Sequence, residues 1–121
     1  MVIGLVLSTG SLLHAGALTS EVAGIRVELT SRPSEPTTKA ETEYVARLAD
    51  QAGAPVTGAR VTLRGGMADG MNVVTPLRAA EPVGVYRGRV LFTMEGTWRL
   101  TLRVARESDR FELTLTERVR R

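Results

Sequence analysis

The chain of 121 residues is predicted to form an all-β fold. Apolar and polar residues alternate along several short stretches, which is the period of a strand that buries one face. Glycine and proline, the strongest turn formers, separate these stretches about every eight to twelve residues. No stretch after residue 20 has the period of an amphipathic helix. The length is that of one domain with a single core.

The alternation predicts seven strands: 25–30, 43–50, 59–64, 72–79, 86–92, 98–104 and 111–116. Strand 72–79 is expected at a sheet edge, because Pro76 has no N–H to donate to a neighbouring strand. Three glycines within residues 65–71 favour a loop there. Short strands with turns of this kind are typical of an immunoglobulin-like β-sandwich of about seven antiparallel strands.

The stretches 86–92 and 98–104 hold most of the large aromatic residues. They flank a short break at Glu95–Gly96, so we expect them to pair as an antiparallel hairpin. Tyr86, Phe92 and Trp98 are expected to fill the core, the alternative being a ligand-binding platform. The Tyr86 hydroxyl is expected to bond to the backbone at a corner of the sandwich.

The first twenty residues carry no charged side chain and begin with an apolar run. Ala15-Gly16-Ala17 has the small-residue pattern that signal peptidase accepts, which favours an export signal cleaved after Ala17. The usual basic start is missing, so an N-terminal anchor or a cytoplasmic amphipathic helix stays as an alternative. We therefore expect a signal peptide or anchor at 1–20 and the sandwich at 21–121, in a periplasmic or extracellular location.

Charge gives no indication of a nucleic-acid partner. The chain has 16 basic and 13 acidic residues, a formal net charge of +3, and a single lysine. Arg87, Arg89, Arg99 and Arg103 fall at outward strand positions, which is typical of a solvated sheet face. Apart from the N-terminal segment, only the basic tail 118–121 offers a contact with anionic lipid.

The residue types favour a protein that is not an enzyme. The absence of cysteine excludes disulfides, thiolate metal sites and a cysteine nucleophile. The single histidine, His14, lies in the predicted leader, so no serine has a histidine base in the domain. Glu112 and Glu117 lie among arginines near the last turn and are expected to form exposed ion pairs.

Four segments carry a resemblance to a known family: residues 53–63, the pair Met67 and Met71, Gly84-Val85-Tyr86, and residues 92–100 with the pattern Phe-x-Met-x-Gly-x-Trp. They make the chain similar to the YtkA-like family, small exported immunoglobulin-like domains related to the FixH proteins. The resemblance implies a secreted or membrane-anchored domain that serves copper or other heavy-metal handling, or cytochrome oxidase assembly. Related members often carry a histidine near the methionine loop, whereas this chain has none there.

Met67, Met71 and Met94 are the candidate metal ligands. Thioether sulfur is a soft, neutral ligand that suits Cu(I). Met67 and Met71 are four residues apart in a glycine-rich loop, and Met94 lies in another turn. The alternative is that these side chains fill gaps at the ends of the sandwich.

The sequence thus predicts an exported, non-enzymatic binding or accessory domain in copper or heavy-metal homeostasis. A structural or protein-interaction domain is the alternative. Such a domain would dock on a membrane metal-transport, efflux or oxidase-assembly complex through an exposed strand edge.

Overall fold

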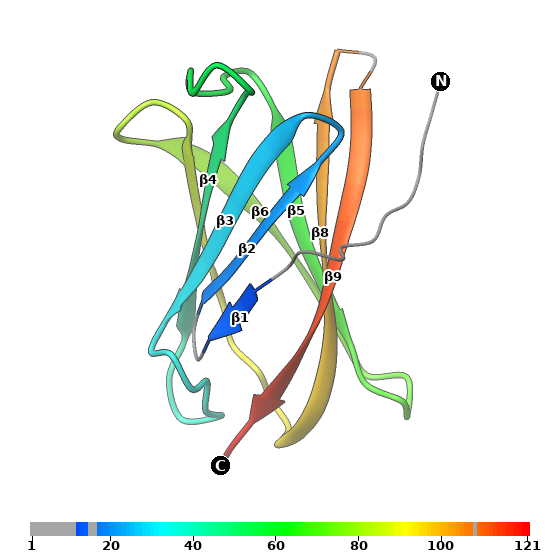
Figure 1. The fold of residues 1–121 in the computed structure, drawn as a ribbon. Helices are drawn as coiled ribbons and strands as arrows, with labels where there is room; N and C mark the ends of the chain where they lie inside the picture. The colour runs from blue at the N-terminus through cyan, green and yellow to red at the C-terminus, as the bar shows by residue number, and fades with distance from the viewer. Residues whose placement is uncertain (1–11, 15–16, 108) are drawn as a thin grey trace.

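The computed structural model describes residues 12–14, 17–107 and 109–121, and within these ranges the chain forms strands and no helix (Figure 1). The strands are β1 (Leu12–His14), β2 (Ala17–Val22), β3 (Ile25–Arg32), β4 (Thr42–Ala49), β5 (Arg60–Gly66), β6 (Asn72–Ala80), β7 (Val85–Val90), β8 (Gly96–Arg106) and β9 (Asp109–Val119). The all-β prediction is confirmed.

The strands follow the order β1-β2-β3-β4-β7-β6-β5-β8-β9, and each strand pairs antiparallel with its neighbours in this order. The sheet folds over at β6, which gives one layer around β3-β4-β7 and another of β5-β8-β9 (Figure 1). From β3 onward this order is that of an immunoglobulin domain, in which the first, second, fifth and fourth strands face the third, sixth and seventh. The immunoglobulin-like sandwich is therefore confirmed.

The core lies between the two layers and is centred on aromatic rings. Phe92 meets Trp98 edge to face with ring centroids 5.1 Å apart, and Tyr44 meets Phe92 in the same way at 6.5 Å. The side chains of Phe92 and Trp98 are both 0% exposed. Tyr86 is also buried, and its hydroxyl donates to the Val56 carbonyl (2.9 Å) and accepts from the Ala59 N–H (3.3 Å). Both the core role of these rings and the backbone bond of Tyr86 are confirmed.

The predicted hairpin between 86–92 and 98–104 is wrong. Strand β7 pairs with β4 and β6, whereas β8 pairs with β5 and β9. Residues 91–95 instead carry the chain from one layer to the other, and Phe92 is buried within this connection. The period of two reports which face of a strand is buried, and it contains no information about which strand is the neighbour.

Strand β6 is not an edge strand, in contrast to the prediction from Pro76. It pairs with β5 over 72–77 and with β7 over Arg78–Ala80. The segment that contains Pro76 therefore has a ladder partner on one side only. On the unpaired side, the N–H that proline lacks is not needed for a hydrogen bond. Gly88 makes room for this crossing, because a Cβ there would lie 2.6 Å from the Pro76 carbonyl oxygen and 2.5 Å from Leu77 Cδ2.

The predicted loop at 65–71 is shorter than expected, because Gly65 and Gly66 belong to β5. Gly65 faces the core, where a Cβ would lie 2.7 Å from Leu100 Cδ2. This glycine thus permits close packing inside a strand and does not mark a turn.

The β-structure begins within the segment predicted as a leader. Strand β2 pairs with β3 along its whole length, and Leu18 and Ser20 are each 5% exposed. The sheet thus extends to the N-terminal side of the predicted boundary at residue 20. The part of the predicted leader at 1–11 and 15–16, including most of the cleavage motif, lies outside the described residues. In the described part of the chain, no helix has the length and apolarity needed to span a membrane.

Candidate functional site

Two loops lie at the lower end of the sandwich in Figure 1, and they contain the three predicted metal ligands. One loop joins β5 to β6, and the other joins β7 to β8. Gly66 is the register partner of Arg99, which places the end of β5 beside the start of β8. A Cβ built on Gly96 would lie 2.7 Å from the Met67 methyl carbon, so this side chain reaches the start of β8, directly after the second loop.

The β5–β6 loop is closed by its own hydrogen bonds. The Met67 N–H donates to the Met71 carbonyl at 2.8 Å, and the Gly70 N–H donates to the Met67 carbonyl at 3.0 Å. The Asp69 carboxylate accepts from the Met71 N–H at 3.0 Å. Gly70 has a φ of +98°, a conformation that favours glycine. The loop therefore holds Met67 and Met71 at its two ends in a defined turn.

The three methionines differ in exposure. Met71 and Met94 are each 39% exposed, whereas Met67 is partly buried against the core. The Met94 carbonyl accepts the indole N–H of Trp98 at 3.0 Å, which ties the second loop to the core. Packing thus accounts for Met67, whereas much of the Met71 and Met94 surface remains in contact with solvent.

The candidate ligands at this end are three thioethers, and the same loops carry single carboxylates at Asp69 and Glu95. Among the described residues, no group of three or more histidine, cysteine, aspartate or glutamate side chains is arranged to hold a metal ion. A metal bound at this end would therefore depend on methionine sulfur, which selects soft ions such as Cu(I) over hard ones.

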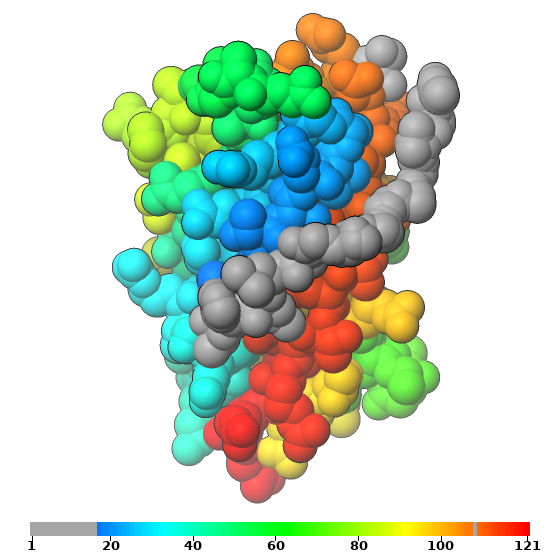
Figure 2. Space-filling model, in the orientation of Figure 1, coloured from blue at the N-terminus to red at the C-terminus, as the bar shows by residue number. Residues whose placement is uncertain are grey.

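A second feature is a cleft of about 280 Å³ where the two layers part between β3 and β9. Figure 2 views the molecule from this side, with β9 in orange and red beside the blue strands. Its lining includes Leu18, Leu29, Ser31, Tyr44, Leu115 and Glu117. The cleft thus has apolar walls and a few hydrogen-bonding groups.

Glu117 points into this cleft from β9. It is the register partner of Trp98, and its carboxylate accepts a hydrogen bond from the Tyr44 hydroxyl at 3.3 Å. Burial raises the pKa of Glu117 above its ordinary value of 4.5, although the bond from Tyr44 opposes the rise. Burial, followed by the nearby carboxylate, raises the pKa of Tyr44, so this hydroxyl stays protonated and donates.

The expectation that Glu112 and Glu117 form exposed ion pairs is right for the first and wrong for the second. Glu112 accepts from Arg103 Nε at 2.8 Å, with both side chains about half exposed. Glu117 is only partly exposed and has no ion pair within the described residues. A signal for this was present, because Glu117 continues the inward alternation of Leu113 and Leu115.

Comparisons with known proteins give a family. The family model described as YtkA-like matches residues 19–103, which is more than half of the 121-residue chain. Searches of curated proteins and of solved structures returned no match. The matched range runs from β2 into β8 and includes Met67, Met71 and Met94. The chain belongs to the YtkA-like family.

Proposed function

We propose that the protein is an exported, non-enzymatic accessory domain that binds Cu(I) through the thioethers of Met67, Met71 and Met94. The observation that supports the proposal best is that the two methionine-bearing loops lie at one end of the sandwich, where the Met67 methyl group lies against Gly96 at the start of β8. Two of the thioethers, those of Met71 and Met94, are accessible to an ion from solvent.

The chemistry of the donors determines which metal this site would take. Neutral thioethers do not offset the charge of a hard divalent ion, whereas they coordinate Cu(I) well. In an oxidising exported compartment, methionine also avoids the disulfide formation to which cysteine is prone. In this proposal the domain would hold copper for a membrane metal-transport or oxidase-assembly complex.

The test is an anaerobic titration of the full chain with Cu(I) against a chromophoric chelator. The double variant Met71→Leu, Met94→Leu keeps the apolar volume of both side chains and removes two sulfur atoms. We expect its Cu(I) affinity to fall at least about tenfold, which is about 1.4 kcal/mol. Ag(I) is a soft ion without redox chemistry, and its affinity should likewise be higher for the parent chain than for the double variant.

Leu91→Ala is the matched control, because it changes an exposed apolar residue of the same β7–β8 connection without touching sulfur. It should bind Cu(I) like the parent chain. Equal affinity of the parent and the double leucine variant would overturn the copper proposal.

A protein-interaction domain is the second candidate, and the position of β9 favours it. This strand pairs with β8 along its length, and among the described residues its other side has no strand partner; the bridge between Arg120 and Thr37 lies just past its end. An edge of this kind can accept a strand from a partner. A complex with a membrane assembly that persists in the Met71→Leu, Met94→Leu variant would support docking without metal.

A further inference from the structure

Arginine gathers on the outer face of the β5-β8-β9 layer. Residues opposite each other in an antiparallel pair share a face, so the register defines rows across the three strands. One row holds Arg60, Ala105 and Arg110, and others pair Arg64 with Thr101, Gly66 with Arg99, and Thr97 with Arg118. The arginines at outward positions of this face, here called the basic face, are Arg60, Arg64, Arg99, Arg103, Arg110 and Arg118.

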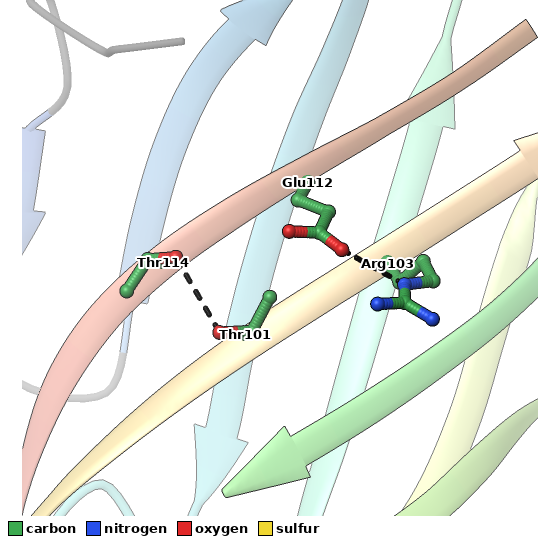
Figure 3. A network of polar contacts seen from close by, with 4 residues as sticks. All are labelled: Thr101, Arg103, Glu112 and Thr114. Atoms are coloured by element: carbon green, nitrogen blue, oxygen red, sulfur yellow. Dashed lines mark hydrogen bonds and ion pairs between the residues drawn. The ribbon is translucent and has the colours of Figure 1, made fainter. Parts of the chain in front are cut away.

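Most of this charge is not neutralised within the protein. Arg103 pairs with Glu112, which is the only carboxylate in these outward rows, and Thr101 and Thr114 lie beside the pair (Figure 3). Within the described residues, the other arginines of the basic face have no carboxylate oxygen within 4.0 Å. Glu107 and Asp109 lie at the β8–β9 turn, beyond the last row.

The opposite layer carries three ion pairs, whereas Arg26, Arg32 and Arg78 there have no carboxylate oxygen within 4.0 Å among the described residues. Arg47 meets Glu28, Arg87 meets Glu43, and Arg89 meets Glu41, each at 3.7 Å. Glu21, Glu28 and Glu43 lie at outward positions of β2, β3 and β4, whereas Glu112 is the one carboxylate in the outward rows of the basic face. The arginines of the opposite layer thus lie among several carboxylates, whereas the six arginines of the basic face share a single one.

Exposed apolar side chains border the basic face at one end. Val74 is 57% exposed and is the register partner of Arg64, so it belongs to the same face. Leu91, at 48%, and Met71 lie in the two loops at that end. The basic face thus ends in an apolar rim.

We propose that the basic face is a docking surface for an anionic lipid bilayer. The guanidinium fork of arginine matches the oxygen atoms of a headgroup phosphate, and the chain uses arginine almost exclusively. A sheet spreads these charges over a broad surface, as a bilayer requires, and the apolar rim can enter the interfacial region. The arginines of this surface are distinct from the proposed copper ligands, although its apolar rim includes Met71, and its test needs no metal.

Nucleic acid fits the same charge less well. Single-stranded nucleic acids bind to basic surfaces that also offer aromatic side chains for stacking. All five aromatic side chains of this chain are buried, with exposures of 6% or less: Tyr44, Tyr86, Phe92, Trp98 and Phe111. A basic face without an exposed ring favours the lipid surface.

The test is co-sedimentation of the full chain with phosphatidylcholine vesicles that contain about 30 mol% phosphatidylglycerol, with pure phosphatidylcholine as reference. We expect binding to the anionic vesicles at about 0.05 M NaCl and its loss at about 0.5 M. The triple variant Arg60→Gln, Arg64→Gln, Arg99→Gln should bind at least about tenfold more weakly. None of these arginines makes an ion pair in the described structure, so the fold should be retained.

The matched control is Arg26→Gln, Arg47→Gln, Arg87→Gln, which removes the same charge from the opposite layer. Its affinity for the anionic vesicles should fall by less than about threefold, because these arginines lie away from the bilayer. Equal loss in both triple variants, equal binding to neutral vesicles, or stronger binding to duplex DNA than to anionic vesicles would each overturn the proposal. Val74→Ser should weaken vesicle binding without changing its salt dependence.

Discussion

Trp98 and Glu117 are register partners on β8 and β9, so both side chains point between the two layers. The indole is fully buried, and its N–H is bonded to the Met94 carbonyl. The carboxyl lies at the parting of the layers, where Tyr44 supplies its single hydrogen bond among the described contacts. A charged group is tolerated at this inward position because the layers are not closed there.

Glu117→Gln is expected to stabilise the protein at neutral pH. Because burial raises the pKa of Glu117 in the folded state, ionisation costs stability as the pH rises through that pKa. The cost is absent below the ordinary value of 4.5, where the carboxyl is protonated in both states. Urea unfolding from acidic to neutral pH should show the variant gaining on the parent chain as the pH rises.

Glu112→Gln provides the control for this experiment. It removes the same charge from the same strand, but at an exposed position where Glu112 is paired with Arg103. It should lower the free energy of unfolding by less than about 1 kcal/mol. If the Glu117→Gln variant instead becomes less stable relative to the parent chain as the pH rises, the assigned direction of the pKa shift is contradicted.

At the scale of elements, β6 determines how the sandwich is closed on one side. It leaves the β5 ladder after Leu77 and joins β7 at Arg78. The crossing passes over Gly88, where the Pro76 carbonyl occupies the space that a side chain would need. A glycine in the middle of a strand therefore serves the connection between the layers.

Gly88→Ala is expected to destabilise the protein by about 1–3 kcal/mol, because the added methyl group overlaps backbone that cannot easily move. The measurement is the urea midpoint at constant slope. Gly66→Ala is the matched control in β5, since its nearest contact would be the Met71 carbonyl at an ordinary 3.7 Å. If both variants lose the same stability, the close approach at Gly88 is not the cause.

Strand β2 gives a second test at this scale. Leu18 and Thr19 are neighbours, but Leu18 is buried on the inner face whereas Thr19 is exposed. In the full chain, Leu18→Ala should cost about 2–4 kcal/mol and Thr19→Ala less than about 0.5 kcal/mol. No effect of Leu18→Ala would mean that β2 contributes nothing to the stability of the folded domain.

At the scale of the whole molecule, the core rather than the surface charges accounts for stability. The five ion pairs of the described residues all lie at the surface, where such pairs contribute little. The unpaired arginines of the basic face therefore bear on what the protein binds and have little effect on whether it folds.

Raising NaCl from about 0.05 M to about 1 M should therefore change the free energy of unfolding by less than about 1 kcal/mol. Urea unfolding followed by the fluorescence of Trp98, the only tryptophan, measures this directly. A larger loss would show that paired charges stabilise the fold more than their exposure suggests. The same salt range should abolish vesicle binding, which separates the two roles of charge.

Patterns among neighbouring residues were enough to predict most of the strands and the types of candidate metal ligand. The alternation of residues such as Trp98, Leu100 and Leu102 identified strands and their buried faces, because a strand's period is a property of a few neighbouring residues. The methionines and the missing cysteines narrowed the candidate chemistry in the same way, since the types of donor atom can be listed from the chain alone.

Only the tertiary structure decided which strands pair and which side chains meet. The crossing at residues 91–95, the passage of β6 over Gly88 and the inward position of Glu117 depend on partners far away in the chain. Contacts of this kind are set by how whole faces pack together, and no short segment records them. The gathering of arginines on one face has the same origin, because it exists only once β5, β8 and β9 lie side by side.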